Sequence, residues 1–137
     1  MTVSQEVLKV QAPRRGLHEF TAPVAAVVAA SGVRSGICNL FIRHTSASLT
    51  IQENADPSAR RDLEAFLDRL VPENLPYFTH TAEGPDDMPS HIKAILTSTS
   101  LTIPVLEGRL ALGTWQGIYL WEHRNEGGPR QIVVSVW

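Results

Sequence analysis

The chain has 137 residues, of which 43% are hydrophobic and 19% are charged, and its formal net charge at pH 7 is −2. This length and composition predict a single folded domain, spanning residues 1–137, with a genuine hydrophobic core. The small negative charge argues against a nucleic-acid-binding protein, because such proteins normally carry clustered excess Lys and Arg.

Two further features bear on where the protein works. Its only cysteine, Cys38, excludes an internal disulfide and fits a reducing compartment, and its apolar neighbours predict a core position. Polar residues near the N-terminus (Gln5, Glu6 and Lys9) argue against a signal peptide, and the longest apolar run, residues 24–30, is too short to span a bilayer. We therefore expect a soluble cytoplasmic protein without membrane partners.

The first part of the chain predicts four strands and one helix. Short apolar segments favour strands over residues 7–10, 17–20, 37–43 and 49–52. Between the second and third of these, a helix is predicted over residues 22–30, with Thr21 as its cap and Gly32 just beyond its end.

The clearest helix follows Asp56, a good N-cap, and Pro57, which suits the first helical position. Its apolar residues form one stripe, made of Leu63, Phe66, Leu67 and Leu70. A second short helix is predicted to begin near Pro89, with Ile92, Ile95 and Leu96 on its buried side. Strands follow over residues 101–105, 109–112, 114–123 and 131–136. Clustered strands with short connections predict an α+β fold with a mostly antiparallel sheet.

The segment from His80 to His91 is the most informative for function. Its two imidazoles bracket three carboxylates (Glu83, Asp86 and Asp87), and Gly and Pro residues interrupt any regular element between them. Such a loop can fold its polar groups onto a cation or an anionic substrate, and neutral imidazole suits metal ligation or proton transfer. The alternative is a solvated turn that is acidic because turns favour Asp, Gly and Pro.

His44 ends the strand predicted over residues 37–43. By period-two alternation it shares a face with Leu40 and Ile42, so it is either a hydrogen-bonded core residue or part of a site. The hydroxyl-rich residues that follow it, among them Ser46, could line a polar pocket.

The strand predicted from residue 114 onward extends its alternation to residue 124. Gln116, Glu122 and Arg124 share one face, and Glu122 would be an awkward core residue without a partner. His123 lies on the opposite, aromatic face and is the weaker candidate for a site. His18 is interpreted as structural.

Three neutral imidazoles suffice for a catalytic zinc-type site that keeps one position open for water. The predicted set is His44, His80 and His91, with Asp87 or Glu122 orienting a ligand or acting as a base. This requires the end of one strand, the loop and the start of a helix to converge. Anion binding is predicted at Lys93, Arg43 and Arg124.

Three segments, residues 44–57, 80–93 and 108–124, closely resemble the YjbQ family, and the Leu112-Gly-Thr-Trp-Gln-Gly117 block is distinctive. The resemblance extends over essentially the whole chain. It implies an α+β fold with a barrel-like sheet and two or three helices, assembled as a homotrimer with sites at subunit boundaries. It also implies metal binding at His44, His80 and His91, with an acid at Glu122. Many relatives carry an Asp two residues before the second histidine, where this chain has Pro89.

Members of the YjbQ family are often labelled secondary thiamine-phosphate synthases. That reaction joins hydroxymethylpyrimidine diphosphate to thiazole phosphate and releases pyrophosphate. The leading hypothesis is therefore a metal-assisted enzyme acting on a phosphorylated small molecule with zinc or magnesium. Asp87, Glu122 and Lys93 are its predicted catalytic residues, and its predicted substrate-binding residues are Arg43, Ser46, Gln116 and Arg124. Two alternatives stay open: a metal-dependent hydrolase and a non-catalytic trimer that binds a metal or metabolite.

Overall fold

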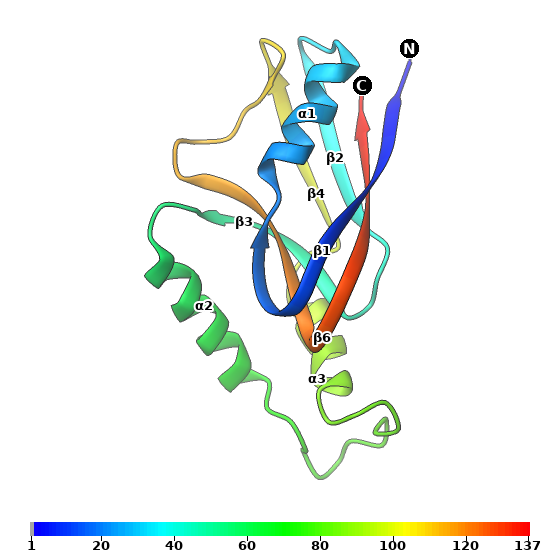
Figure 1. The fold of residues 1–137 in the computed structure, drawn as a ribbon, viewed down its shortest axis with the longest axis vertical. Coiled ribbons are helices and arrows are strands. Elements are labelled where there is room, and N and C mark those ends of the chain that lie inside the picture. The colour runs from blue at the N-terminus through cyan, green and yellow to red at the C-terminus, as the bar shows by residue number, and fades with distance from the viewer. Residues whose placement is uncertain (1) are drawn as a thin grey trace.

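The computed structural model describes residues 2–137, and two long antiparallel strands dominate it. β1 (Ser4–Glu19) pairs with β6 (Gln116–Val136) along most of its length. Both strands bend sharply near the middle, so each has two arms that run in different directions (Figure 1). The sequence predicted each of these strands as two separate pieces. The structure joins the pieces because the two bent strands keep pairing with each other on both sides of the bend.

The remaining strands attach to the arms of β6 and complete one six-stranded sheet. The first arm pairs with β3 (Ala47–Glu53), and the second pairs with β2 (Gly36–Ile42). β4 (Ser100–Leu106) and β5 (Arg109–Leu110) extend the sheet beyond β2. All pairings are antiparallel, and the sheet curls into a half-barrel. The predicted α+β fold with a barrel-like antiparallel sheet is confirmed.

The bend contains an irregular pairing that matters for the site. Arg14 pairs with Glu126 and Gly16 with Glu122, so β1 advances by two residues while β6 advances by four. The extra residues of β6 bulge, which strengthens the local bend. Gly127, just outside this bulge, must be glycine, since a Cβ atom there would collide with the Ala12 carbonyl oxygen and with the Glu122 carboxylate.

The main core lies inside the curled sheet beneath α1 (Thr21–Ser31). It includes Val24 and Val28 of the helix together with Cys38, Leu40 and Leu120 of the strands, all at most 1% exposed. Burial raises the pKa of the Cys38 thiol to about 11, as expected for an inert core cysteine. α1 ends at Gly32 as predicted. The predicted cap was wrong, because Thr21 lies inside the helix and its hydroxyl instead accepts a hydrogen bond from the Ile118 backbone N–H.

A second, smaller core lies on the other face of the sheet. Tyr119 and Trp121 of β6 pack there with Leu67 of α2 (Pro57–Leu70). As predicted, α2 begins after Asp56, whose side chain accepts a hydrogen bond from the Ser58 N–H. The predicted apolar stripe is only partly buried, because Phe66 and Leu70 are 66% and 56% exposed.

α3 (Asp87–Leu96) departs furthest from prediction. Ile95 and Leu96, expected to be buried, are 81% and 55% exposed. The buried face of the helix instead carries Asp87, Ser90 and Lys93. These polar residues can be buried because each has a hydrogen-bonding partner in the protein.

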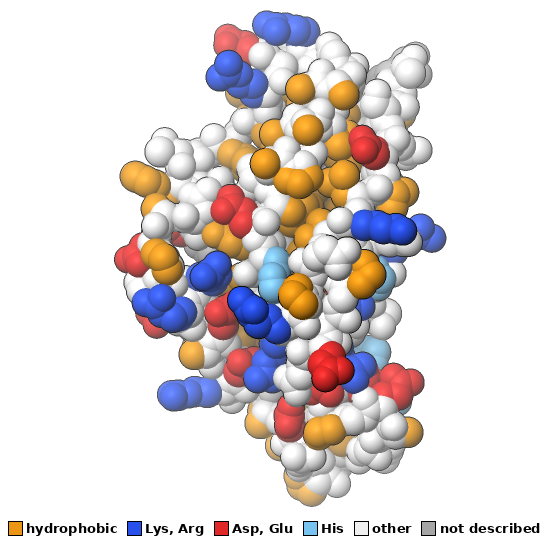
Figure 2. Space-filling model, viewed as in Figure 1, with side chains coloured by type: hydrophobic (Ala, Val, Ile, Leu, Met, Phe, Trp, Pro, Cys, Tyr) orange, Lys and Arg blue, Asp and Glu red, His pale blue; other side chains and the backbone are white. Residues whose placement is uncertain are grey.

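In Figure 2 apolar side chains gather in the upper middle of the visible face, over α1, and most of the charged side chains lie below them, with a few at the top end. Within residues 2–137, no helix has the length and apolar character needed to span a membrane.

Candidate metal centre and adjoining pocket

The segment from His80 to His91 brings three ligand-type side chains together. Asp87 is the first residue of α3 and His91 lies four positions later, so both point from one face of the helix. His80 reaches them from the preceding loop. The Nε2 atoms of His80 and His91 lie 2.7 Å and 3.2 Å from the same oxygen, Asp87 Oδ2. The loop therefore turns Asp86 and Asp87 inward, while His80 stays partly exposed beside them.

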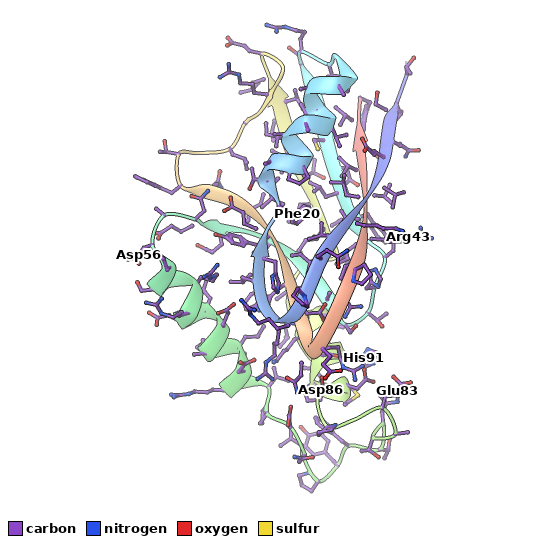
Figure 3. The ribbon with its side chains drawn as sticks, viewed as in Figure 1. Phe20, Arg43, Asp56, Glu83, Asp86 and His91 are labelled. Atoms are coloured by element: carbon purple, nitrogen blue, oxygen red, sulfur yellow. The ribbon has the colours of Figure 1, made fainter. Side chains whose placement is uncertain are left out.

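Arg124 attaches this loop to the sheet. Its guanidinium donates to Asp87 Oδ1 (2.7 Å), to Asp86 Oδ2 (3.0 Å) and to the Glu83 carbonyl oxygen (2.8 Å). The backbone N–H of Asn125 adds a bond to Asp86 Oδ2 at 2.9 Å. Figure 3 shows Glu83, Asp86 and His91 grouped at the lower end of the sheet. The contacts of the Arg124 guanidinium are all made to the loop. Arg124 therefore holds Asp86 and Asp87 in position.

Asp86 and Asp87 are both ionised near pH 7, because their surroundings lower the pKa of each carboxyl group. Burial alone would raise the pKa of Asp87, but hydrogen bonds from His80 and the charge of Arg124 outweigh it and lower the pKa. For Asp86, burial is likewise outweighed, by the bonds from Asn125 and Arg124. Asp87 is 2% exposed and thus a fixed, buried negative charge.

This donor set fits a divalent transition metal. One ligand atom each from His80, Asp87 and His91 lies within 4.8 Å of the others. Ligand atoms about 2.0–2.1 Å from a tetrahedral ion lie roughly 3.3 Å apart, so small movements would suffice for coordination. Two imidazoles and a carboxylate are typical zinc ligands, whereas magnesium prefers oxygen. The His80 and His91 side chains are 48% and 33% exposed, which leaves one side of the cluster open to solvent.

His44, the third predicted ligand, is not brought into this cluster. Its Nε2 accepts a hydrogen bond from the Gln131 backbone N–H at 2.8 Å, and its Nδ1 lies 3.3 Å from Arg130 Nη1. Within residues 2–137, the group of side chains able to hold a metal ion is His80, Asp87 and His91. Its third member is thus Asp87, and not His44 as the sequence predicted.

Three other predicted site residues are engaged elsewhere. Glu122 is fully buried and receives two bonds of 2.6 Å from Arg130. Lys93 is buried and donates to Asp68 Oδ1 at 2.6 Å, which ties α3 to α2. Gln116 lies at the start of β6, where its side chain accepts a bond from the Gly113 N–H. The structure does not bring these three residues to the His80, Asp87 and His91 cluster.

A pocket of about 670 Å³ adjoins the cluster. One wall is the end of β2 and the turn after it, including the predicted substrate-binding residues Arg43 and Ser46. The other wall comes from α3 and includes His91 and Ile95. His44 and His91 thus line the same pocket from different elements. Figure 3 labels Arg43, which directly follows β2.

Sequence analysis missed two polar contacts near the pocket. One is Arg130, the partner that buried Glu122 requires. The sequence indicated that a buried Glu122 needs a partner. It did not identify Arg130, because the two residues meet only through the bend of β6. The other is a chain of hydrogen bonds in which Ser48 Oγ lies 2.6 Å from Thr97 Oγ1 and 2.9 Å from His123 Nε2.

Residues 6–137 match the family model described as UPF0047 protein YjbQ-like. The chain belongs to the UPF0047 (YjbQ-like) family. It is 52% identical to the UPF0047 protein sll1880 of Synechocystis sp., over 96% of this chain and 90% of that protein. It is 47% identical to the UPF0047 protein YjbQ of Escherichia coli O157:H7, over 96% of both chains.

Solved structures of related proteins share the fold. A YbjQ-like protein of unknown function from Sulfolobus solfataricus superposes with a TM-score of 0.84 at 27% identity, covering 98% of this chain and 96% of that one. An uncharacterised YjbQ/UPF0047 protein from Clostridium acetobutylicum gives a TM-score of 0.80 at 37% identity, with 96% of each chain covered. The predicted family is confirmed, and these relatives carry no assigned activity in their descriptions.

Proposed function

We propose that His80, Asp87 and His91 bind a divalent transition metal ion, with zinc as the best match, and that the protein uses it on a phosphorylated small molecule held in the adjoining pocket. The observation that carries this proposal is the convergence of three ligand atoms, one of them on a buried aspartate whose second oxygen is held by Arg124. Such outer hydrogen bonds orient metal ligands and tune their affinity.

When bound, a zinc ion would supply Lewis-acid polarisation of a phosphoryl oxygen. The chain's own residues then have separate tasks. His91 connects the ligand cluster to the pocket, because it contributes to both. Arg43 is exposed at the pocket and carries no carboxylate partner among the described residues, so its charge is free to attract an anionic substrate.

The reaction suggested by the family resemblance is thiamine-phosphate synthesis, with release of pyrophosphate. Lys93 is poorly placed to neutralise the leaving group, since it is 2% exposed and paired with Asp68; we assign that charge to Arg43 instead. Hydrolysis has no observation of its own in its favour. Its proposed bases, Asp87 and Glu122, are both engaged in buried ion pairs.

The metal-binding part is tested by titrating zinc into chelator-treated protein by calorimetry. We expect one zinc ion per chain and weaker binding of magnesium. His80→Ala and His91→Ala should each weaken zinc binding by at least about 100-fold. His18→Ala is the matched control, because within residues 2–137 the His18 ring bonds only to the Arg14 carbonyl oxygen, outside the cluster. Equal zinc affinity in all four proteins would reject the assignment.

The catalytic part is tested separately, by measuring pyrophosphate release from the two thiamine-phosphate precursors with the zinc-loaded protein. Turnover should be lost in Asp87→Asn and retained in His18→Ala. If the protein binds zinc but turns over neither these precursors nor phosphate esters, the catalytic proposal is rejected and the protein is a non-catalytic metal-binding protein.

We also propose that the chain assembles as a homotrimer, as the family resemblance implies. Support comes from the exposed apolar side chains of α2 and α3, namely Phe66, Leu70, Ile95 and Leu96, which a subunit interface could cover. Light scattering coupled to size-exclusion chromatography should give a mass close to three chains; the mass of one chain would reject the trimer.

A further inference from the structure

A second polar network lies behind the strand wall of the pocket, across from the cluster of His80, Asp87 and His91. Arg130 is its centre: the side chain is 13% exposed and is held by both oxygens of Glu122. The same guanidinium contacts two residues that line the pocket. Its Nη2 donates to Ser46 Oγ at 3.0 Å, and its Nη1 lies 3.3 Å from His44 Nδ1.

The surroundings of His44 cannot all be satisfied within the protein. Both groups that face its ring nitrogens are obligatory donors, the Gln131 backbone N–H and the Arg130 guanidinium. A neutral imidazole has only one acceptor nitrogen, so only one of these contacts is a hydrogen bond. The 2.8 Å contact from Gln131 to Nε2 is the shorter, which places the ring proton on Nδ1.

The proton on Nδ1 leaves two donors side by side. His44 Nδ1–H and Arg130 Nη1 then face each other as two donors at 3.3 Å, and neither has another acceptor among residues 2–137. Ser46 adds a third donor, because its oxygen accepts from Arg130 while its own O–H has no protein acceptor in the described chain. Three neighbouring donors without acceptors favour a shared anion.

The charges of the network agree with this conclusion. Burial and the charge of Arg130 lower the pKa of His44, so the ring is neutral near pH 7. Glu122 balances Arg130, which leaves Arg43 as the uncompensated charge at this wall, and that charge is positive.

We propose that His44 Nδ1–H, Arg130 Nη1–H and the Ser46 hydroxyl together bind a phosphate group of the substrate, with Arg43 attracting it into the pocket. A phosphate monoester offers three strong acceptor oxygens, whereas a carboxylate offers two. The inference rests on the proposed function, since it names the group by which a phosphorylated substrate is held beside His91. It also gives His44 the role of an anion donor in place of a metal ligand.

The test uses chelator-treated protein, so it does not depend on the metal centre. The tautomer of His44 is read from long-range ¹H–¹⁵N spectra, and inorganic phosphate is titrated while its binding is followed in the same spectra and by calorimetry. Sodium acetate is the second probe. The variants are His44→Gln, which keeps an acceptor for Gln131 but lacks the Nδ1 donor, and Ser46→Ala. His18→Gln and Ser100→Ala are the matched controls, because neither residue lines this pocket.

We expect the Nδ1–H tautomer, saturable phosphate binding and much weaker acetate binding. His44→Gln should weaken phosphate binding by about 10-fold or more, Ser46→Ala by about 3- to 10-fold, and the controls by less than about 2-fold. An Nε2–H tautomer, non-saturable phosphate shifts, acetate binding as tight as phosphate, or variants that bind like the controls would each overturn the proposal. If His44→Gln fails to fold, the wild-type tautomer and Ser46→Ala still decide. Zinc affinity is measured in parallel, so failure of the metal centre and failure of this subsite are distinguishable.

Discussion

The two polar clusters beside the pocket are built in opposite ways. His80, Asp87 and His91 come from one loop and the first turns of one helix, and their imidazoles are partly exposed. The network around Arg130 joins strands whose residues lie 86 positions apart, and its central ion pair is buried. The open cluster keeps its two imidazoles within reach of solvent. The closed network holds the bent sheet together and presents only a few donors to the pocket.

The largest effect should come from breaking the closed network. Arg130→Met leaves Glu122 fully buried without its partner and should lower the free energy of unfolding by about 3–5 kcal/mol. Urea denaturation measures this, and the double variant Glu122→Gln with Arg130→Met should recover part of the loss. His91→Ala, in the open cluster, should change stability by less than about 1 kcal/mol in metal-free protein. Equal losses in the two clusters would erase the distinction between them.

Lowering the pH should also destabilise the folded protein, through the buried side chain of His123. Burial lowers the pKa of His123 to about 3 in the folded protein, aided by the charges of Lys93 and Arg130, against about 6.5 in the unfolded chain. Between these values only the unfolded chain takes up the proton, so stability falls as the pH drops through this window.

From pH 6.5 to 4.5 this should cost about 2–3 kcal/mol of unfolding free energy. His123→Phe should remove most of that pH dependence, and His18→Phe should leave it in place. A wild-type stability that is flat over this range would contradict the buried, neutral state of His123.

A smaller effect is expected from removing Arg124, the residue of β6 that holds the loop carrying Asp87. Arg124→Gln removes the guanidinium that holds Asp87 Oδ1 and the loop, so zinc affinity should fall by about 10- to 100-fold while the fold persists. Zinc calorimetry with Arg109→Gln as the control measures this. Unchanged affinity would mean that Asp87 needs no support from β6.

The contrast between the clusters also explains what could be predicted from the sequence. His80, Asp87 and His91 could be grouped because the chain itself keeps them close, and Gly and Pro residues prevent a strand from separating them. The antiparallel α+β fold followed from the order of apolar segments. The partner of Glu122 could not be identified, because Arg130 reaches it only through the bulge and bend of β6.

Burial on the helices was mispredicted for a related reason. Apolar periodicity predicts which helix face is buried only when that face packs against apolar residues. α3 packs its polar face, with Asp87 and Lys93, against charged partners on β6 and α2. Its apolar residues Ile95 and Leu96 remain exposed as a consequence.

The most direct test of the account is a crystal of zinc-loaded protein measured on both sides of the zinc absorption edge. We predict one anomalous peak per chain, about 2.0–2.2 Å from the ring nitrogens of His80 and His91 and from an oxygen of Asp87. A peak ligated by His44, or the absence of any peak between these three side chains, would contradict it.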